Sequence, residues 1–137
     1  MNTPTRRRFL TASGSLAFAP LLARAAGESV PEGLIDAHVH VWTGDKSKYP
    51  LSANFSEKDM DPAVFTPEDL FAEQKGTGVT RTVLIQMSFY EFDNQYMLDA
   101  IEAHPDRFRG VAIVDASVAG VGDRMKALAA KGVRGFR

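Results

Sequence analysis

Three polar residues alternate with apolar ones in a short segment that is rich in β-forming side chains. Asp36, His38 and His40 occupy every second position of residues 33–42. In a β-strand, residues two apart share one face and lie about 6.6 Å apart along the backbone. Neutral imidazoles are common metal ligands, and a carboxylate or carbonyl that accepts the other ring N–H fixes the tautomer. The pattern therefore predicts a face on which His38 and His40 hold a divalent ion, with two satisfied structural histidines as the alternative.

Three further side chains are candidates for binding a substrate. Gln86 and Ser88 share one face at the end of a second apolar segment, residues 81–87, where they either line a pocket or form a simple polar strand end. Arg137 follows a fourth apolar segment, and its planar guanidinium suits a substrate carboxylate, although a solvent-facing strand end explains it equally well. His104 precedes Pro105 at a predicted helix end, so we expect it to interact with the helix dipole.

The rest of the chain predicts an alternation of strands and helices that positions these side chains. The expected elements are strands at 33–42, 81–87, 110–115 and 133–137, a loop at 43–65, and helices at 66–78, from Asp93 to Pro105 and at 123–131. Such alternation indicates a parallel sheet covered by helices. The carboxyl ends of parallel strands are where active sites gather, and a loop as long as 43–65 is usually functional. No Gly-x-Gly-x-x-Gly follows the first strand, so a dinucleotide-binding fold has no support.

Composition excludes several classes of site. The 137 residues contain 16 Lys or Arg, 17 Asp or Glu and no cysteine, which rules out disulfides, thiolate metal sites and cysteine nucleophiles. Four of the basic residues and none of the acidic ones lie in residues 1–25, so the remainder is acidic. An acidic remainder argues against binding to nucleic acid.

Residues 1–25 have the organisation of an export signal. A run of arginines precedes a short apolar stretch, and Ala23-Arg24-Ala25 forms a small-x-small cleavage site. Residues 5–10, with Arg6 and Arg7, resemble the twin-arginine signal S/T-R-R-x-F-L. The resemblance implies a partner in the twin-arginine export machinery, cleavage after Ala25 and a periplasmic location. An amphipathic amino-terminal helix is the alternative, and the apolar stretch is too short to span a bilayer.

Residues 33–137 resemble the amidohydrolase superfamily, specifically the amidohydrolase-related branch that contains sugar lactonases, dicarboxylate lactonases and decarboxylases. The opening strand at 35–42, Ile-Asp-Ala-His-Val-His-Val-Trp, carries the main resemblance. The supporting segments, in order, are Tyr49-Pro50, 83–86, 104–108 and 132–137.

The resemblance implies an α/β fold, a (β/α)8 TIM barrel in which His38 and His40 hold a divalent metal, expected to be zinc. Some lactonases of this group work without a metal, so metal dependence stays open. A complete barrel needs about 250 residues. We therefore expect residues 26–137 to form its amino-terminal half, with about four parallel strands and three helices. The general-base aspartate of the family lies on the eighth strand, beyond position 137.

The expected function is that of an exported hydrolase that opens a lactone or a similar ester-like bond with activated water. Its substrate would be a small lactone or carboxylate, and residues 26–137 alone are expected to be inactive. A decarboxylase on the same scaffold is one alternative. A non-catalytic half-barrel completed by a partner or a second copy is another, because the first and fourth strands would leave unpaired edges.

Overall fold

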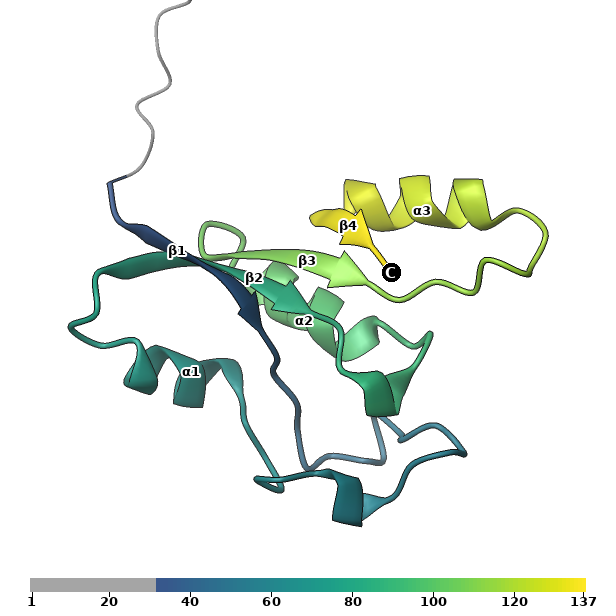
Figure 1. The fold of residues 1–137 in the computed structure, drawn as a ribbon, viewed down its shortest axis with the longest axis horizontal. Coiled ribbons are helices and arrows are strands. Elements are labelled where there is room, and N and C mark those ends of the chain that lie inside the picture. The colour runs from purple at the N-terminus through teal and green to yellow at the C-terminus, as the bar shows by residue number, and fades with distance from the viewer. Residues whose placement is uncertain (1–31) are drawn as a thin grey trace, which may run out of the picture. The chain divides into compact units, whose positions relative to one another are not determined.

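The computed structural model describes residues 32–137 (Figure 1). The predicted export signal, with Arg6, Arg7 and cleavage after Ala25, lies outside the described residues. In chain order the elements are β1 (Leu34–Val39), α1 (Pro67–Glu73), β2 (Val79–Ile85), α2 (Gln95–Ala103), β3 (Phe108–Ala112), α3 (Val121–Ala130) and β4 (Val133–Phe136), with short 3-10 helices at Glu57–Asp59 and Ser88–Tyr90. The predicted alternation of four strands and three α-helices is confirmed. Within residues 32–137, no helix is long and apolar enough to cross a membrane.

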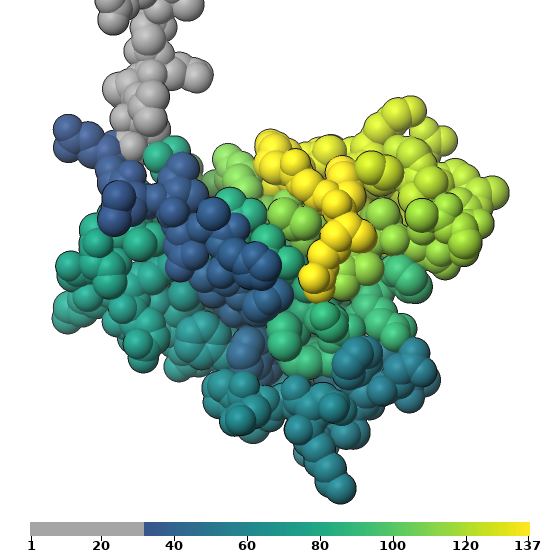
Figure 2. Space-filling model, in the orientation of Figure 1, coloured from purple at the N-terminus to yellow at the C-terminus, as the bar shows by residue number. Residues whose placement is uncertain are grey.

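All strand pairings are parallel, and the strands follow one another in the order β1-β2-β3-β4. Each crossover carries one α-helix, as parallel pairing requires. The four carboxyl ends therefore meet at one edge of the sheet, which is where β1 leads into the long connection to α1 (Figure 1). β1 and β4 are the outer strands, and Figure 2 shows both at the surface, with Leu34 61% and Ile35 53% exposed.

Several predicted boundaries are displaced by two or more residues. β2 runs over Val79–Ile85 rather than 81–87, because the more polar residues before its apolar run also pair with neighbouring strands. β3 likewise begins at Phe108 rather than at 110. α1 ends at Glu73, well before the predicted 78, since Gly76 and Gly78 adopt left-handed backbone conformations with φ of 79° and 81° that turn the chain into β2.

Local capping explains where the first two helices begin. The backbone N–H of Thr66 donates to Asp69 Oδ2 at 2.8 Å, and the backbone N–H of Asp69 donates to Thr66 Oγ1 at 3.3 Å, a capping box that confirms the predicted start of α1. The helix predicted from Asp93 is α2: the Asp93 carboxylate accepts the backbone N–H of Gln95, its first residue, at 3.0 Å, and Asn94 occupies the N-cap position. Asn94 is buried because its amide bonds to the backbone of Ile113 after β3, donating at 2.8 Å and accepting at 2.9 Å.

The main core lies between the sheet and the helices. Its strand residues are almost completely buried, with Leu84 and Ala112 0% exposed and Phe108 and Val133 1% exposed. A second cluster of buried side chains packs the long connection against the segment after β2: Trp42, Tyr49, Met60, Phe89 and Tyr90. This cluster holds the connection over the carboxyl edge of the sheet.

Candidate functional site

The two predicted histidines lie together at the carboxyl edge of the sheet. His38 is in β1, and His40 follows it directly. Their ring centroids are 5.2 Å apart, with the ring planes at 75°. His38 is exposed and His40 is half-buried. The alternation in the sequence therefore brings both imidazoles to one place, as predicted.

A backbone carbonyl rather than Asp36 orients His40. His40 Nδ1 lies 2.8 Å from the carbonyl oxygen of Ile85, at the end of β2. Because a carbonyl only accepts, Nδ1 carries the hydrogen and the lone pair is on Nε2. Burial lowers the pKa of His40, the bond to Ile85 opposes that effect, and the nearby charges of His38 and Arg137 lower the pKa further. His40 is therefore a neutral imidazole near pH 7, with Nε2 available to a ligand.

Arg137 joins the end of β4 to the end of β2. Its backbone N–H donates to Ala112 O at 2.9 Å, continuing the pairing with β3. Its Nη2 donates to the carbonyl oxygen of Gln86 at 3.0 Å and to Ser88 Oγ at 3.2 Å. Arg137, Ser88 and His40, which come from the ends of three strands, thus meet at one edge.

The side chain of Gln86 has a different position from the one predicted. It is 1% exposed, and its Nε2 donates to the carbonyl oxygen of Asp93 at 2.6 Å. Gln86 therefore contacts Arg137 through its backbone and uses its side chain to hold the segment before α2. Ser88 lies in the 3-10 helix after β2 rather than on a strand face.

A pocket of about 440 Å³ adjoins Ser88. Its lining residues come from the long connection, the segment after β2 and the residue after β3: Asn54, Phe55, Ser88, Glu91, Phe92 and Ile113. Glu91 has a φ of 47°, and its carboxylate accepts a bond from Asn54 Nδ2 at 2.8 Å. Strained backbone gathers at functional sites. Sequence reasoning missed Glu91, because no glycine or asparagine marks the left-handed position.

The donor set for a metal is incomplete within residues 32–137. His38 and His40 supply two imidazoles in contact, and the tautomer of His40 suits ligation through Nε2. A catalytic zinc site uses three protein ligands. The described residues contain no group of three or more His, Asp or Glu side chains that could hold a metal ion. His38 and His40 therefore fit two positions of a larger set.

Comparisons with known proteins give the family. Residues 35–137 match the sequence model of the amidohydrolase family. A 2-pyrone-4,6-dicarboxylate hydrolase of Comamonas testosteroni is 32% identical over 108 residues, covering 79% of this chain and 33% of that protein.

Solved structures give the same answer for the fold. A probable 2-pyrone-4,6-dicarboxylic acid hydrolase from Acinetobacter baumannii, with citric acid bound, is 28% identical with a TM-score of 0.61, over 77% of this chain and 37% of that one. A protein assigned to the same hydrolase class, from Pseudomonas putida, is 27% identical with a TM-score of 0.61, over 79% and 37%. This chain thus spans about a third of the length of these relatives.

These matches confirm the predicted fold class. The four parallel strands and three α-helices of residues 32–137 correspond to part of an amidohydrolase-type TIM barrel, and the histidines lie at the carboxyl edge, where such barrels carry their sites. The chain belongs to the amidohydrolase family.

Proposed function

We propose that the whole protein hydrolyses a lactone that carries carboxylate groups. The observation that carries the proposal is the meeting of Arg137 and Ser88 with the neutral His40 at the carboxyl edge of the sheet. A guanidinium binds a carboxylate, and a neutral imidazole with its lone pair on Nε2 can take up a proton or bind a metal ion. The names of the relatives, 2-pyrone-4,6-dicarboxylate hydrolases, support a substrate of this class.

The residues have distinct roles in this proposal. Arg137 binds a substrate carboxylate while Ser88 and the Gln86 carbonyl hold its guanidinium in place. His38 stabilises the lactone carbonyl oxygen as it becomes an oxyanion and His40 takes up a proton at Nε2, or else both imidazoles serve as metal ligands. A bound divalent metal, proposed to be zinc, would act as a Lewis acid on that carbonyl. The family resemblance assigns the general base to an aspartate outside the described residues.

A pair of substrates tests the role of Arg137. Arg137→Gln in the whole protein is expected to raise KM for 2-pyrone-4,6-dicarboxylate at least about tenfold, because a charge-assisted pair contributes roughly 1.5–3 kcal/mol. Turnover of an uncharged pyrone lactone should change less than about threefold. Lys126→Gln, on the exposed side of α3, is the charge-matched control. Equal losses on both lactones would contradict carboxylate binding, and absence of hydrolysis by the wild-type protein would contradict the proposed function.

Metal content is tested separately. Elemental analysis of wild type, His38→Ala and His40→Ala is expected to show about one zinc per wild-type chain and a loss of zinc in both variants. A metal-free wild-type protein with full activity would leave the imidazoles as hydrogen-bonding groups only.

We also propose that the protein is exported to the periplasm by the twin-arginine route. The support is the signal-like sequence around Arg6 and Arg7 with its cleavage site after Ala25. Replacing both arginines with lysine is expected to leave uncleaved protein in the cytoplasm. Normal periplasmic accumulation of that variant would contradict the proposal.

A further inference from the structure

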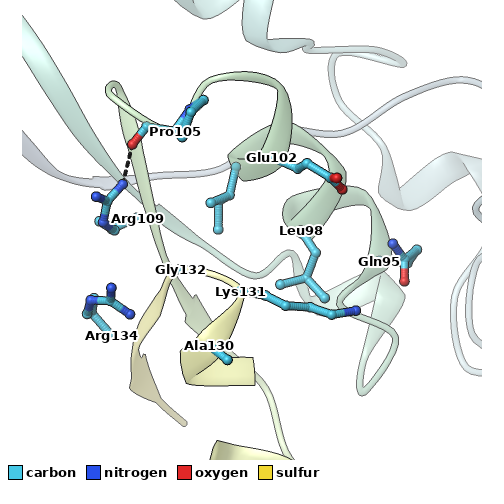
Figure 3. Close-up of a pocket in the computed structure, with 10 residues that line it drawn as sticks. Gln95, Leu98, Glu102, Pro105, Arg109, Ala130, Lys131, Gly132 and Arg134 are labelled. Carbon is cyan, nitrogen blue, oxygen red and sulfur yellow. Dashed lines mark hydrogen bonds between the residues drawn. The ribbon is translucent and has the colours of Figure 1, made fainter. Parts of the chain in front are cut away.

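We infer that the edge of the sheet opposite the histidines carries a second binding site, for a small oxyanion such as a phosphate or a di- or tricarboxylate. A pocket of about 460 Å³ lies there between α2, α3 and the amino-terminal ends of β3 and β4 (Figure 3). Arg109 is the second residue of β3 and Arg134 the second residue of β4, and Lys131 follows α3. His38, His40 and Arg137 do not line this pocket. The inference is independent of the proposed function.

The charges around the pocket are unbalanced. Arg109, Lys131 and Arg134 line it together with a single carboxylate, that of Glu102. The ion pairs formed within residues 32–137 all lie elsewhere, so none of these three cations has a carboxylate partner among the described residues. This clustering occurs in a chain that carries a net negative charge. An anion in the pocket would supply the counter-charge that these cations lack.

Both arginines are held in place by only part of their donor set. Arg109 Nη1 donates to the carbonyl oxygens of Pro105 and Phe108, just beyond α2. Arg134 Nη1 donates to those of Ala129 and Val133, at 2.8 Å each, at the end of α3. A guanidinium has five N–H donors, and neither arginine bonds a described residue through Nη2 or Nε. The remaining donors are therefore pre-positioned for a ligand.

Helix capping accounts for only part of this arrangement. Cations near the carboxyl end of a helix stabilise its last carbonyls, which explains the bond from Arg134 Nη1 to Ala129 O, whereas Arg109 Nη1 bonds carbonyls in the turn after α2. It does not explain Lys131, whose ammonium forms no hydrogen bond or ion pair with a described residue. Figure 3 shows Lys131 extended along the side of the pocket away from the two arginines. A ligand between them would face cations on both sides.

The apolar part of the lining limits the ligand further. Leu98, Ile101, Pro105 and Ala130 contribute apolar side chains to the same pocket. The volume of about 460 Å³ suits a small molecule rather than a polymer. The pocket therefore favours an anion with two or more charged oxygens and a compact body, whether the charge comes from phosphate or from carboxylates.

Titration calorimetry on the whole protein tests this site, with inorganic phosphate and citrate as separate probes at low ionic strength. We expect at least one probe to bind, and to bind more weakly as salt is added. Lys131→Gln is the decisive variant because its ammonium supports no bond of the fold, and it should weaken binding at least about threefold. Arg134→Gln should weaken binding about tenfold, as expected for loss of a charge-assisted hydrogen bond. Tighter binding of citrate than of phosphate identifies a polycarboxylate ligand, and the reverse identifies a phosphate.

Two controls separate this site from the rest of the molecule. Lys126→Gln removes the same charge from α3, which precedes Lys131, at a position outside the pocket, and should bind as wild type does. Arg137→Gln removes a cation of the histidine site and should leave binding at Lys131 unchanged. The proposal is overturned if neither probe binds, if Lys131→Gln binds as wild type does, or if Arg137→Gln alone abolishes binding.

Discussion

Asp99 in α2 is expected to fasten the long connection over the candidate site. Tyr49, in that connection, is 8% exposed, and its hydroxyl donates to Asp99 Oδ2 at 2.6 Å. Lys48 Nζ contacts the same oxygen at 3.1 Å, and Gln95 Nε2 donates to Asp99 Oδ1. Burial alone would raise the pKa of Asp99, but the bonds from Tyr49, Gln95 and Lys48 together lower it. The carboxylate is therefore ionised at neutral pH and links two segments about fifty residues apart.

These contacts determine how much Asp99→Ala lowers the free energy needed to open the long connection. Loss of a hydrogen bond to a charged acceptor costs roughly 1.5–3 kcal/mol, and here it leaves the largely buried Tyr49 hydroxyl without its partner. The Lys48 side chain is 61% exposed, so solvent screens its ion pair and the pair adds little. Alanine favours helix, so α2 itself is retained. We therefore expect the connection to open about 2 kcal/mol more easily.

Hydrogen exchange measures that local opening. The backbone N–H of Ser52 donates to Phe89 O at 2.9 Å and reports on the closed connection. In Asp99→Ala, a loss of about 2 kcal/mol accelerates its exchange roughly 30-fold, whereas exchange in the core of β2 should not change. Lys48→Gln, the control, should accelerate it less than about fivefold.

A double-mutant cycle identifies the bond responsible. Tyr49→Phe combined with Asp99→Ala should be markedly less than additive, because either change removes the same bond. Additive effects, or equal acceleration in Asp99→Ala and Lys48→Gln, would refute the reasoning.

Three further predictions concern stability, measured as urea midpoints. Asp69→Asn weakens the capping box of α1, whose hydrogen bonds lower the pKa of Asp69 in the folded protein. The loss of stability in this variant should be complete above about pH 4, the ordinary pKa of an aspartate. It should disappear as the pH falls through the pKa of folded Asp69, because the wild-type protein then loses the same charge. Gly132→Ala should destabilise the protein more than Gly120→Ala does. Gly132 has a φ of 96°, and an added Cβ would lie 2.7 Å from Ile101 Cγ2, whereas Gly120 has a φ of 79° and open space around it. Equal urea midpoints for the two variants would contradict the clash. Leu84→Ala, in a fully buried position, should cost about 3 kcal/mol, and a cost under 1 would contradict its place in the core.

The local sequence determined the elements and part of the site. Thr66-Pro67 and Asp69 mark a helix start through contacts within one turn, so the start of α1 could be predicted. The alternation at Asp36, His38 and His40 likewise depends only on the period of a strand. The order of strands and helices followed from the same short-range periodicities, and it was sufficient to indicate a parallel α/β sheet.

Tertiary structure decided what each of these side chains contacts. His40 takes its orientation from Ile85, 45 positions away, and Arg137 meets Ser88 across 49 positions. Asn94, at the N-cap position of α2, bonds through its amide to the backbone after β3, 19 positions away. These partners depend on how neighbouring strands align, and strand register is set by packing of the whole sheet rather than by residues nearby in the chain. The sequence therefore predicted which groups reach the carboxyl edge, whereas the register of the sheet determined which of them touch.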